Sequence, residues 1–271
     1  MPKLLVTIFV VFVMHSSTCF SQVLETEESN PLAPGQFEIG TGIEFQTSKE
    51  GTETALPIAI EYGLTRRFSI LVEPVGFTNI HNKRSNSATG FGDLEVTLFY
   101  QLTTEGKIMP AISISAEVKL PTTKNSLIGT GKTDYTPFLI ATKTTGRFFT
   151  SANLSYTILG KPKGVSVTNL FNYAVGTIYT ASERNILFAE LYGNTSAFGT
   201  DVPETTNVIQ APAMTTEISG GEVVGSIGFG RYIKKDLLLS MGVSYDNNKA
   251  ILFRPGIEWS FGRKNSRIRI H

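Results

Sequence analysis

The feature that most limits how this chain can fold is a period-two alternation of apolar and small or polar side chains. In AILFRPGIEWSF (residues 250–261) one face carries Ile251, Phe253, Pro255, Ile257, Trp259 and Phe261, and the other carries Leu252, Arg254, Gly256, Glu258 and Ser260. The stretches DLLLSMGVSYD (236–246) and PAISISAEVKL (110–120) divide in the same way. Successive side chains of a β-strand point to opposite faces, so the pattern predicts strands between two different environments.

The connections between these segments alternate in length. Short links such as LTRR, TTGR and SERN alternate with longer ones, including TNIHNKRSNSATGF and the stretch from Thr195 to Gly220. This layout predicts an all-β fold, a transmembrane antiparallel β-barrel of about 12 strands with short periplasmic turns and longer extracellular loops. The strands are expected to start near Gln36, Thr54, Arg67, Gly92, Ile108, Tyr135, Phe148, Thr168, Asn185, Glu222, Asp236 and Ala250.

A soluble β-sandwich alternates too, and the composition of the polar face argues against it. That face is rich in Gly, Ser, Thr and Ala with isolated acids, whereas a sandwich exposes long charged side chains to water. The apolar face often ends in an aromatic residue, where lipid headgroups lie against a membrane barrel. These aromatic residues are Phe37, Tyr62, Phe68, Tyr100, Tyr156, Tyr245, Trp259 and Phe261.

The N-terminus has the pattern of a secretory signal peptide. Lys3 precedes an apolar run from Leu4 to Met14, which is too short to cross a membrane because a spanning helix needs ~20 residues. We expect a signal peptide over residues 1–21, a short periplasmic leader over 22–34, the outer-membrane barrel over 35–261 and a basic tail over 262–271. The single cysteine, Cys19, excludes disulfides and thiolate metal sites within the chain.

The stretch SLIGTGKTDYTPFLI, residues 126–140, carries part of a nucleotide-binding phosphate loop. Gly131, Lys132 and Thr133 match the end of that motif, but Ser126 stands where its first glycine belongs. The residues that follow indicate a strand, whereas a phosphate loop opens a helix. The stretch is better interpreted as the end of an outer loop, with Lys132 and Asp134 at the mouth of the pore.

Two motifs in the middle of the chain resemble a known family. GFGDLEVTLFYQL (Gly90–Leu102) followed by AEVKLPTTKNSLIGTGKTDY (Ala116–Tyr135) is similar to the meta-pathway phenol-degradation type of transporter-like outer-membrane barrel. The resemblance implies an outer-membrane location and uptake of a small, aromatic solute. It implies no catalytic residues. The tail after Phe261 departs from such barrels, which commonly end at the aromatic residue.

Sorting each strand by face sends most mid-strand charges to the inside of the barrel. The candidate lumen-lining residues are Glu38, Glu44, Glu61, Glu73, Asp93, Glu95, Glu117, Lys119, Glu190, Arg254 and Glu258. One hypothesis is an acidic pore lining that favours cations. The other is that these acids pair with Lys119 and Arg254 and hold the lumen closed. The sequence leaves both open.

The histidines bear on whether the barrel is an enzyme, and the net charge bears on its partners. His81, near Ser85 and Asn86 on a predicted outer loop, is the one histidine outside the predicted signal peptide and the last residue, so a barrel lipase or protease is disfavoured. A structural or adhesive barrel with a closed lumen is the other alternative. No cofactor, metal or nucleotide is expected, because the phosphate-loop motif is incomplete and the chain has too few cysteines and histidines for a metal site made of them, and the net charge of +1 indicates no nucleic-acid partner. The expected partners are outer-membrane lipid, a small solute and the barrel-assembly machinery.

Overall fold

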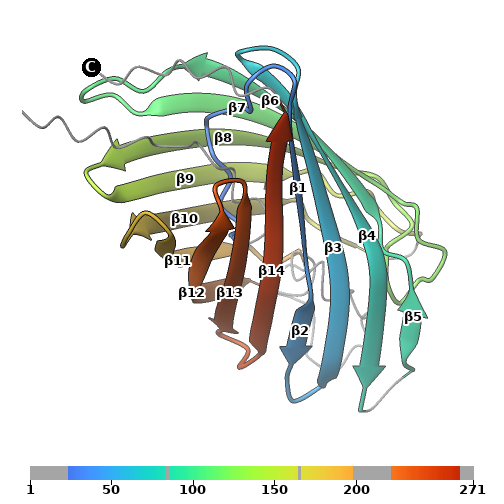
Figure 1. Cartoon of the computed structure of the whole chain (residues 1–271). Helices are drawn as coiled ribbons and strands as arrows, with labels where there is room; N and C mark the ends of the chain where they lie inside the picture. The colour runs from blue at the N-terminus through green and yellow to red at the C-terminus, as the bar shows by residue number, and fades with distance from the viewer. Residues whose placement is uncertain (1–23, 84–85, 164–165, 198–220, 263–271) are drawn as a thin grey trace, which may run out of the picture.

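The computed structural model describes residues 24–83, 86–163, 166–197 and 221–262. These residues form fourteen strands in one sheet that curls round into a barrel (Figure 1). The strands are β1 Gln36–Gly42, β2 Glu44–Thr47, β3 Gly51–Gly63, β4 Phe68–Asn82, β5 Ala88–Gly90, β6 Leu94–Thr103, β7 Ala111–Leu120, β8 Asp134–Thr145, β9 Phe148–Thr157, β10 Leu170–Thr180, β11 Asn185–Asn194, β12 Glu222–Lys234, β13 Leu237–Asp246 and β14 Ile251–Gly262. The predicted signal peptide and all but the first residue of the predicted tail lie outside the described residues.

The sheet is closed and antiparallel. β1 pairs with β14, with Gln36 opposite Gly262 and Gly42 opposite Gly256. β2 continues the same edge against β14, and Ile43 between them donates its N–H to the Pro255 carbonyl at 3.0 Å. β5 and β6 share β4 as a neighbour in the same way. The fourteen described strands therefore make twelve crossings, and the predicted 12-stranded barrel is confirmed.

The two ends of the barrel differ in their connections. Links at the end where β1 begins and β14 finishes are short, as in residues 64–67, 146–147 and 181–184. Those at the other end include the long stretches 121–133 and 158–169. We call these the short-turn end and the long-loop end. Two links at the long-loop end, 48–50 and 247–250, are nevertheless short, and most of the predicted loop from Thr195 to Gly220 lies outside the described residues.

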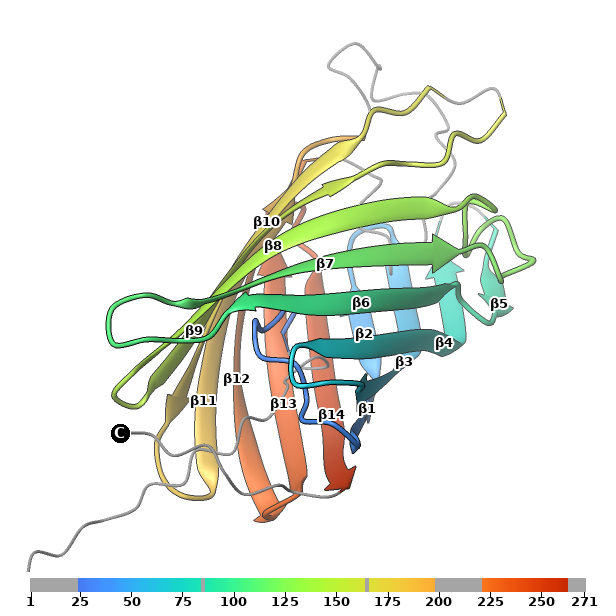
Figure 2. The same cartoon turned by 90° about the horizontal axis from the view of Figure 1, so that it is seen from above.

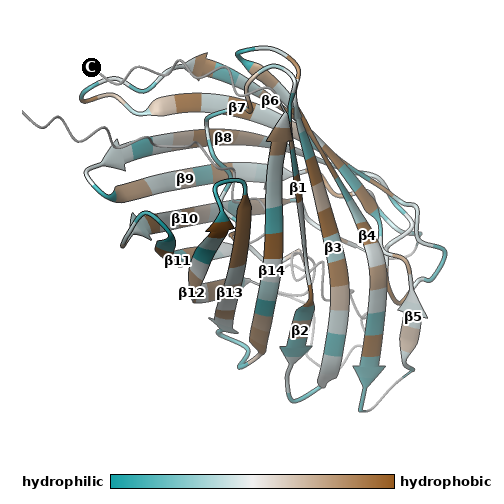
Figure 3. Ribbon diagram, in the orientation of Figure 1, coloured by the Kyte–Doolittle hydropathy of each residue, from teal (hydrophilic) through white to brown (hydrophobic). Residues whose placement is uncertain are grey.

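The outer face of the barrel is apolar, since large hydrophobic side chains of the strands are exposed on it, and Figure 3 shows hydrophobic bands interrupted by more polar ones along the strands. Leu154, Ile227 and Met241 leave about half or more of their surface exposed, at 50%, 68% and 58%. Aromatic rings gather at the short-turn end, where Phe37 lies 4.5 Å from Tyr62, ring centre to ring centre. An apolar band with aromatic rings at its edge matches hydrocarbon bounded by lipid headgroups. No helix among the described residues has the length and apolarity to cross a membrane.

The inner face is polar along most of its length and apolar in patches nearer the short-turn end. Buried hydroxyl side chains include Ser69, Thr78, Thr97, Ser113, Thr136, Thr142, Ser151, Ser155, Ser226 and Ser244. One apolar patch joins Leu71, Phe99 and Ile140, and another joins Ile186, Phe188 and Leu238. The polar face of the sequence therefore surrounds a lumen that is partly filled by side chains.

Residues 24–33, which we call the lumenal segment, lie inside the ring of strands (Figure 2). These residues are expected in a periplasmic leader, but they lie in the lumen because the barrel wall has room for them. A Cβ atom added at Gly176 on β10 would lie only 2.9 Å from the Thr26 hydroxyl. At the short-turn end, a Cβ at Gly63 would lie 2.2 Å from the Ala33 carbonyl oxygen. Glycine at these two positions lets the segment lie directly against the wall.

Candidate functional site: an acidic cavity above a segment in the lumen

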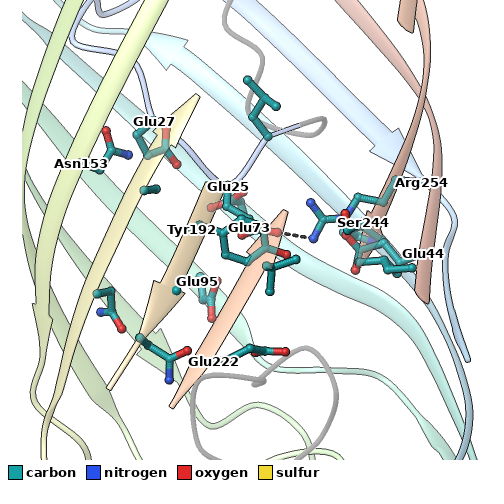
Figure 4. Close-up of a pocket in the computed structure, with 18 of the residues that line it drawn as sticks. Glu25, Glu27, Glu44, Glu73, Glu95, Asn153, Tyr192, Glu222, Ser244 and Arg254 are labelled. Atoms are coloured by element: carbon teal, nitrogen blue, oxygen red, sulfur yellow. Dashed lines mark hydrogen bonds and ion pairs between the residues drawn. The ribbon is translucent and has the colours of Figure 1, made fainter. Parts of the chain in front are cut away.

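A cavity of about 250 Å³ occupies the half of the barrel nearer the long-loop end (Figure 4). It is bounded by wall strands and, on the inner side, by the start of the lumenal segment. Among the described residues that line it, nine carry carboxylates and one carries a guanidinium, Arg254. The carboxylates belong to Glu25, Glu27, Glu44, Glu53, Glu73, Glu95, Glu117, Glu222 and Asp246. Acidic side chains therefore far outnumber the cationic one in the described lining of the cavity.

Arg254 joins the wall to the lumenal segment. Its Nε lies 3.0 Å from Glu44 Oε1 on β2, and its Nη2 forms an ion pair with Glu25. The Arg254 and Glu44 side chains are 10% and 20% exposed, whereas Glu25 is 46% exposed, so the pair with Glu44 is the better shielded from water. Arginine suits such a position because its fork of N–H groups can bind two carboxylates at once. The single cation of the described cavity lining is thus already engaged by two of its acids.

The segment is bound on one side to β9, β11 and the apolar patch. Thr26 donates its backbone N–H to Glu190 Oε1 at 2.6 Å, and its hydroxyl donates to the same oxygen. The Asn153 side-chain amide, turned so that both of its polar atoms are satisfied, pairs with the backbone N–H and carbonyl of Glu27. Leu24 packs in the patch with Phe188 and its neighbours.

The next residues of the segment are bound to β6, β7 and β8. Thr142 Oγ1 accepts the Ser29 N–H at 2.9 Å. The Ser29 carbonyl accepts from Ser113 Oγ at 2.6 Å and from Gln101 Nε2 at 3.1 Å. The contacts of the segment therefore follow neighbouring wall strands from β11 through β9 to β6, and the segment lies against this part of the wall inside the lumen (Figure 2).

A second group of acids lies toward the short-turn end. Glu28 of the segment faces Glu38, Glu61 and Glu258 of the wall, and all four side chains are buried. Ser260 Oγ donates to Glu38 Oε2 at 2.6 Å. Among the described residues, no set of three or more His, Cys, Asp or Glu side chains has the arrangement of a metal site. The group is therefore a continuation of the acidic lining beyond the segment.

The lumen-lining residues predicted from the sequence fall into two sets, with one exception. Glu44, Glu73, Glu95, Glu117 and Arg254 line the cavity. Glu38, Glu61, Glu190 and Glu258 are buried against the segment or beyond it, and Lys119 is buried near the long-loop end. Asp93 is the exception. Its Oδ1 accepts the Thr123 N–H at 3.0 Å, so it fixes the base of the 121–133 loop.

The prediction for Asp134, at the pore mouth beside Lys132, is corrected by the structure. Asp134 is the first residue of β8 and lies in register with Lys119 of β7, with which it forms a buried ion pair. Its Oδ1 also accepts the Gly160 N–H at 2.7 Å. Lys132 is exposed in the outer loop, as expected for a residue near the mouth.

Sequence reasoning missed the acids of the lumenal segment and those at the outer strand ends. Glu53, Glu222 and Asp246 sit on inward positions of β3, β12 and β13, so the period-two sorting could have found them. Glu25 and Glu27 belong to a stretch without alternation. No pattern in that stretch indicates that it enters the lumen.

A closed barrel with an apolar belt outside and a polar lumen inside defines an integral outer-membrane β-barrel protein. Over residues 32–266 the chain matches the family described as "Putative MetA-pathway of phenol degradation" and belongs to that family. The resemblance drawn from the two central motifs is thereby confirmed. Comparison with curated proteins finds no significant match.

Solved structures of similar fold are bacterial outer-membrane proteins. An outer membrane channel from Pseudomonas putida F1 is 11% identical, with 86% of this chain and 98% of that chain covered and a TM-score of 0.64. The NanC porin is 12% identical, with 82% and 98% covered and a TM-score of 0.55. The KdgM porin in complex with disordered oligogalacturonate is 13% identical, with 83% and 99% covered and a TM-score of 0.53. At these identities the likeness shows the shared fold.

Proposed function

We propose that this protein is an outer-membrane channel for passive passage of a small solute, and that the solute is cationic. The observation that carries the proposal is the cavity lining, in which nine carboxylates face one arginine among the described residues. Charge of one sign around a confined aqueous space attracts ions of the other sign and repels like ions. Arg254 pairs with Glu44 and Glu25, and no other lysine or arginine of the described chain lines this cavity.

The similar structures support a channel and also sharpen the solute class. The P. putida protein is a channel, and KdgM is a porin bound to oligogalacturonate, a chain of sugar acids. A polyanion of that kind would be repelled by the cavity of the present protein. A volume of about 250 Å³ is below the usual range for drug-sized ligands, which favours a small organic or inorganic cation.

Two other classes are weighed against the channel. A barrel enzyme is disfavoured because His81 is exposed at the rim of β4, with Ser87 Oγ 3.3 Å from its Nδ1, rather than held in a pocket. A structural barrel with a closed lumen is the second candidate, since the lumenal segment occupies part of the bore. We also propose that the barrel-assembly machinery inserts the protein and that nucleotides and nucleic acids are not ligands.

The test is the reversal potential of the purified full-length protein in a planar bilayer under a KCl gradient. We expect current that is selective for K⁺, and weaker selectivity in a Glu73→Gln/Glu95→Gln variant. Glu105→Gln is the matched control, because Glu105 lies in the turn after β6 and pairs with Lys143 outside the cavity. Anion selectivity would contradict the cationic solute. Absence of current from both the wild type and a variant with a displaced lumenal segment would favour the structural barrel.

A further inference from the structure

We propose that the lumenal segment, residues 24–33, is a displaceable plug that closes the channel between the acidic cavity and the short-turn end. This inference rests on the proposed channel function. It assigns the segment a closed position, which the structure shows, and an open position in which the contacts with the wall are released. Three features of the segment support it: its place in the lumen, the contacts that hold it there and the charge that opposes its insertion.

The position of the segment obstructs the lumen. Thr26 is hydrogen-bonded to Glu190 on β11, and three residues later Ser29 is bonded to strands β6–β8. Leu24 fills the apolar patch of Phe188 on one wall. Ser29 is fully buried, which means that wall and segment enclose it without access for water. A solute entering the cavity therefore meets the segment before it reaches the short-turn end.

The segment is held by polar contacts that can exchange with water. These are the Arg254–Glu25 ion pair, the Thr26 bonds to Glu190 and the bonds around Ser29. Individual hydrogen bonds of this kind contribute only about 0.5–1.5 kcal/mol net, and up to about 3 kcal/mol with a charged partner. No disulfide can tie the segment down, because the chain has only one cysteine. The closed position thus depends on a small number of reversible contacts.

Repulsion between like charges opposes the inserted position. The segment brings Glu25, Glu27 and Glu28 into a lumen whose wall is already acidic. Glu27 faces Glu61 and Glu190, and Glu28 faces Glu38 and Glu61. Against these, the cation nearest the segment is Arg254, which is shared with Glu44. The segment therefore adds three acidic side chains to a lumen that is already acidic, which is a less favourable place for it than for a neutral or basic segment. Such a balance suits a plug that leaves when its ion pair is broken.

A disulfide test follows from the close approach of Thr26 to Gly176. A Cβ added at Gly176 lies 3.1 Å from the Thr26 Cβ, near the ~3.5–4.5 Å separation that a disulfide needs. Thr26→Cys/Gly176→Cys would therefore lock the segment to β10 after oxidation. Cys19 falls in the predicted signal peptide, so it should not interfere with the pair. The matched control is Ser226→Cys/Ser244→Cys, whose hydroxyls lie 2.8 Å apart between β12 and β13. It places the same bond between two wall strands.

The readout is the open fraction in a planar bilayer before and after reduction with dithiothreitol. For a plug, we expect the oxidised Thr26→Cys/Gly176→Cys protein to open at least about tenfold less than its reduced form, with no such change in the control pair. Arg254→Gln should open more often than the wild type. Equal current from the locked and reduced forms, with disulfide formation verified by mass, would overturn the plug. If reduced, locked and Arg254→Gln forms all fail to conduct, the channel function itself is wrong.

Discussion

The buried ion pair between Lys119 and Asp134 offers the sharpest stability prediction. The two side chains stand opposite each other on β7 and β8, with 4% and 6% of their surface exposed. They lie at the two ends of the 121–133 loop, so the pair fastens the base of that loop. Lys119→Met removes the cation and leaves Asp134 with the Gly160 N–H, 2.7 Å from its Oδ1.

The expected magnitude follows from leaving one charge buried alone. Removing one partner of a buried ion pair costs about 3–5 kcal/mol, whereas replacing both partners by neutral groups is often close to neutral. We therefore expect Lys119→Met and Asp134→Asn each to lower the free energy of unfolding by about 3 kcal/mol or more. The double variant should lose less than about 2 kcal/mol, because the amide oxygen introduced by Asp134→Asn can still accept from Gly160 and neither member of the pair is left charged.

The assay is urea unfolding of the barrel refolded in lipid vesicles, followed by tryptophan fluorescence. The chain has one tryptophan, Trp259 on β14, which is 54% exposed on the outer face and remote from the β7–β8 pair in the strand order. Its emission therefore reports the whole barrel. Lys132→Met removes an exposed cation of the neighbouring loop and should change the free energy of unfolding by no more than about 0.5 kcal/mol.

The double variant decides whether the reasoning holds. If each single variant costs less than about 1 kcal/mol, or if the two losses simply add in the double variant, the pair is not a coupled buried pair. In that case the two charges would be hydrated through the loop and would not form a pair shielded from water.

Two further predictions concern the lipid-facing surface and the short-turn end. Leu154→Arg, on the outer face of β9, should lower the free energy of unfolding in vesicles by about 2–4 kcal/mol. The control Leu154→Met should change it by close to zero. An effect of Leu154→Arg below about 1 kcal/mol would place Leu154 outside the hydrocarbon. Partial burial raises the pKa of the Glu105 carboxyl, but the hydrogen bonds from Lys143 and Thr144 outweigh it and hold that pKa below its ordinary value. A carboxyl whose pKa is lowered by folding stabilises the fold at pH values above its ordinary pKa. This stabilisation is lost as the pH falls through the lower pKa of the folded state. In the Lys143→Met variant, the free energy of unfolding should therefore fall less steeply with decreasing pH below about 4.5. An unchanged pH dependence would show that Lys143 does not lower the pKa of Glu105.

Much of the barrel could be predicted from the sequence because the information is local. Alternation in a stretch such as 250–261 fixes which side chains share a face, and Glu258 and Arg254 do point inward. The same sorting failed at strand ends. Asp93 and Asp134 share the inward face, yet both accept hydrogen bonds from neighbouring loops. The partner of a residue at a strand end depends on the register between strands, which the alternation along one strand does not specify.

The lumenal segment could not be predicted because its place is set by non-local contacts. Residues 24–33 are short, polar and acidic, which is the composition of a solvated leader. What draws them inside is the space left by Gly176, together with Glu190, Thr142 and Arg254, which lie more than a hundred residues away in the chain. Neither the alternation of side chains nor a short motif predicts contacts between residues so far apart in the chain.

The closure of β1 on β14 has a consequence for how the molecule is assembled. The lumenal segment directly precedes β1, and the strand that seals the wall is therefore joined to the chain that lies within it. Either the segment is inside before the seam forms, or its end is threaded through the short-turn opening afterwards. A bulky folded domain fused ahead of residue 24 would prevent the second route and strain the first. A fusion after Gly262 leaves both routes free, because that end of β14 emerges at the rim.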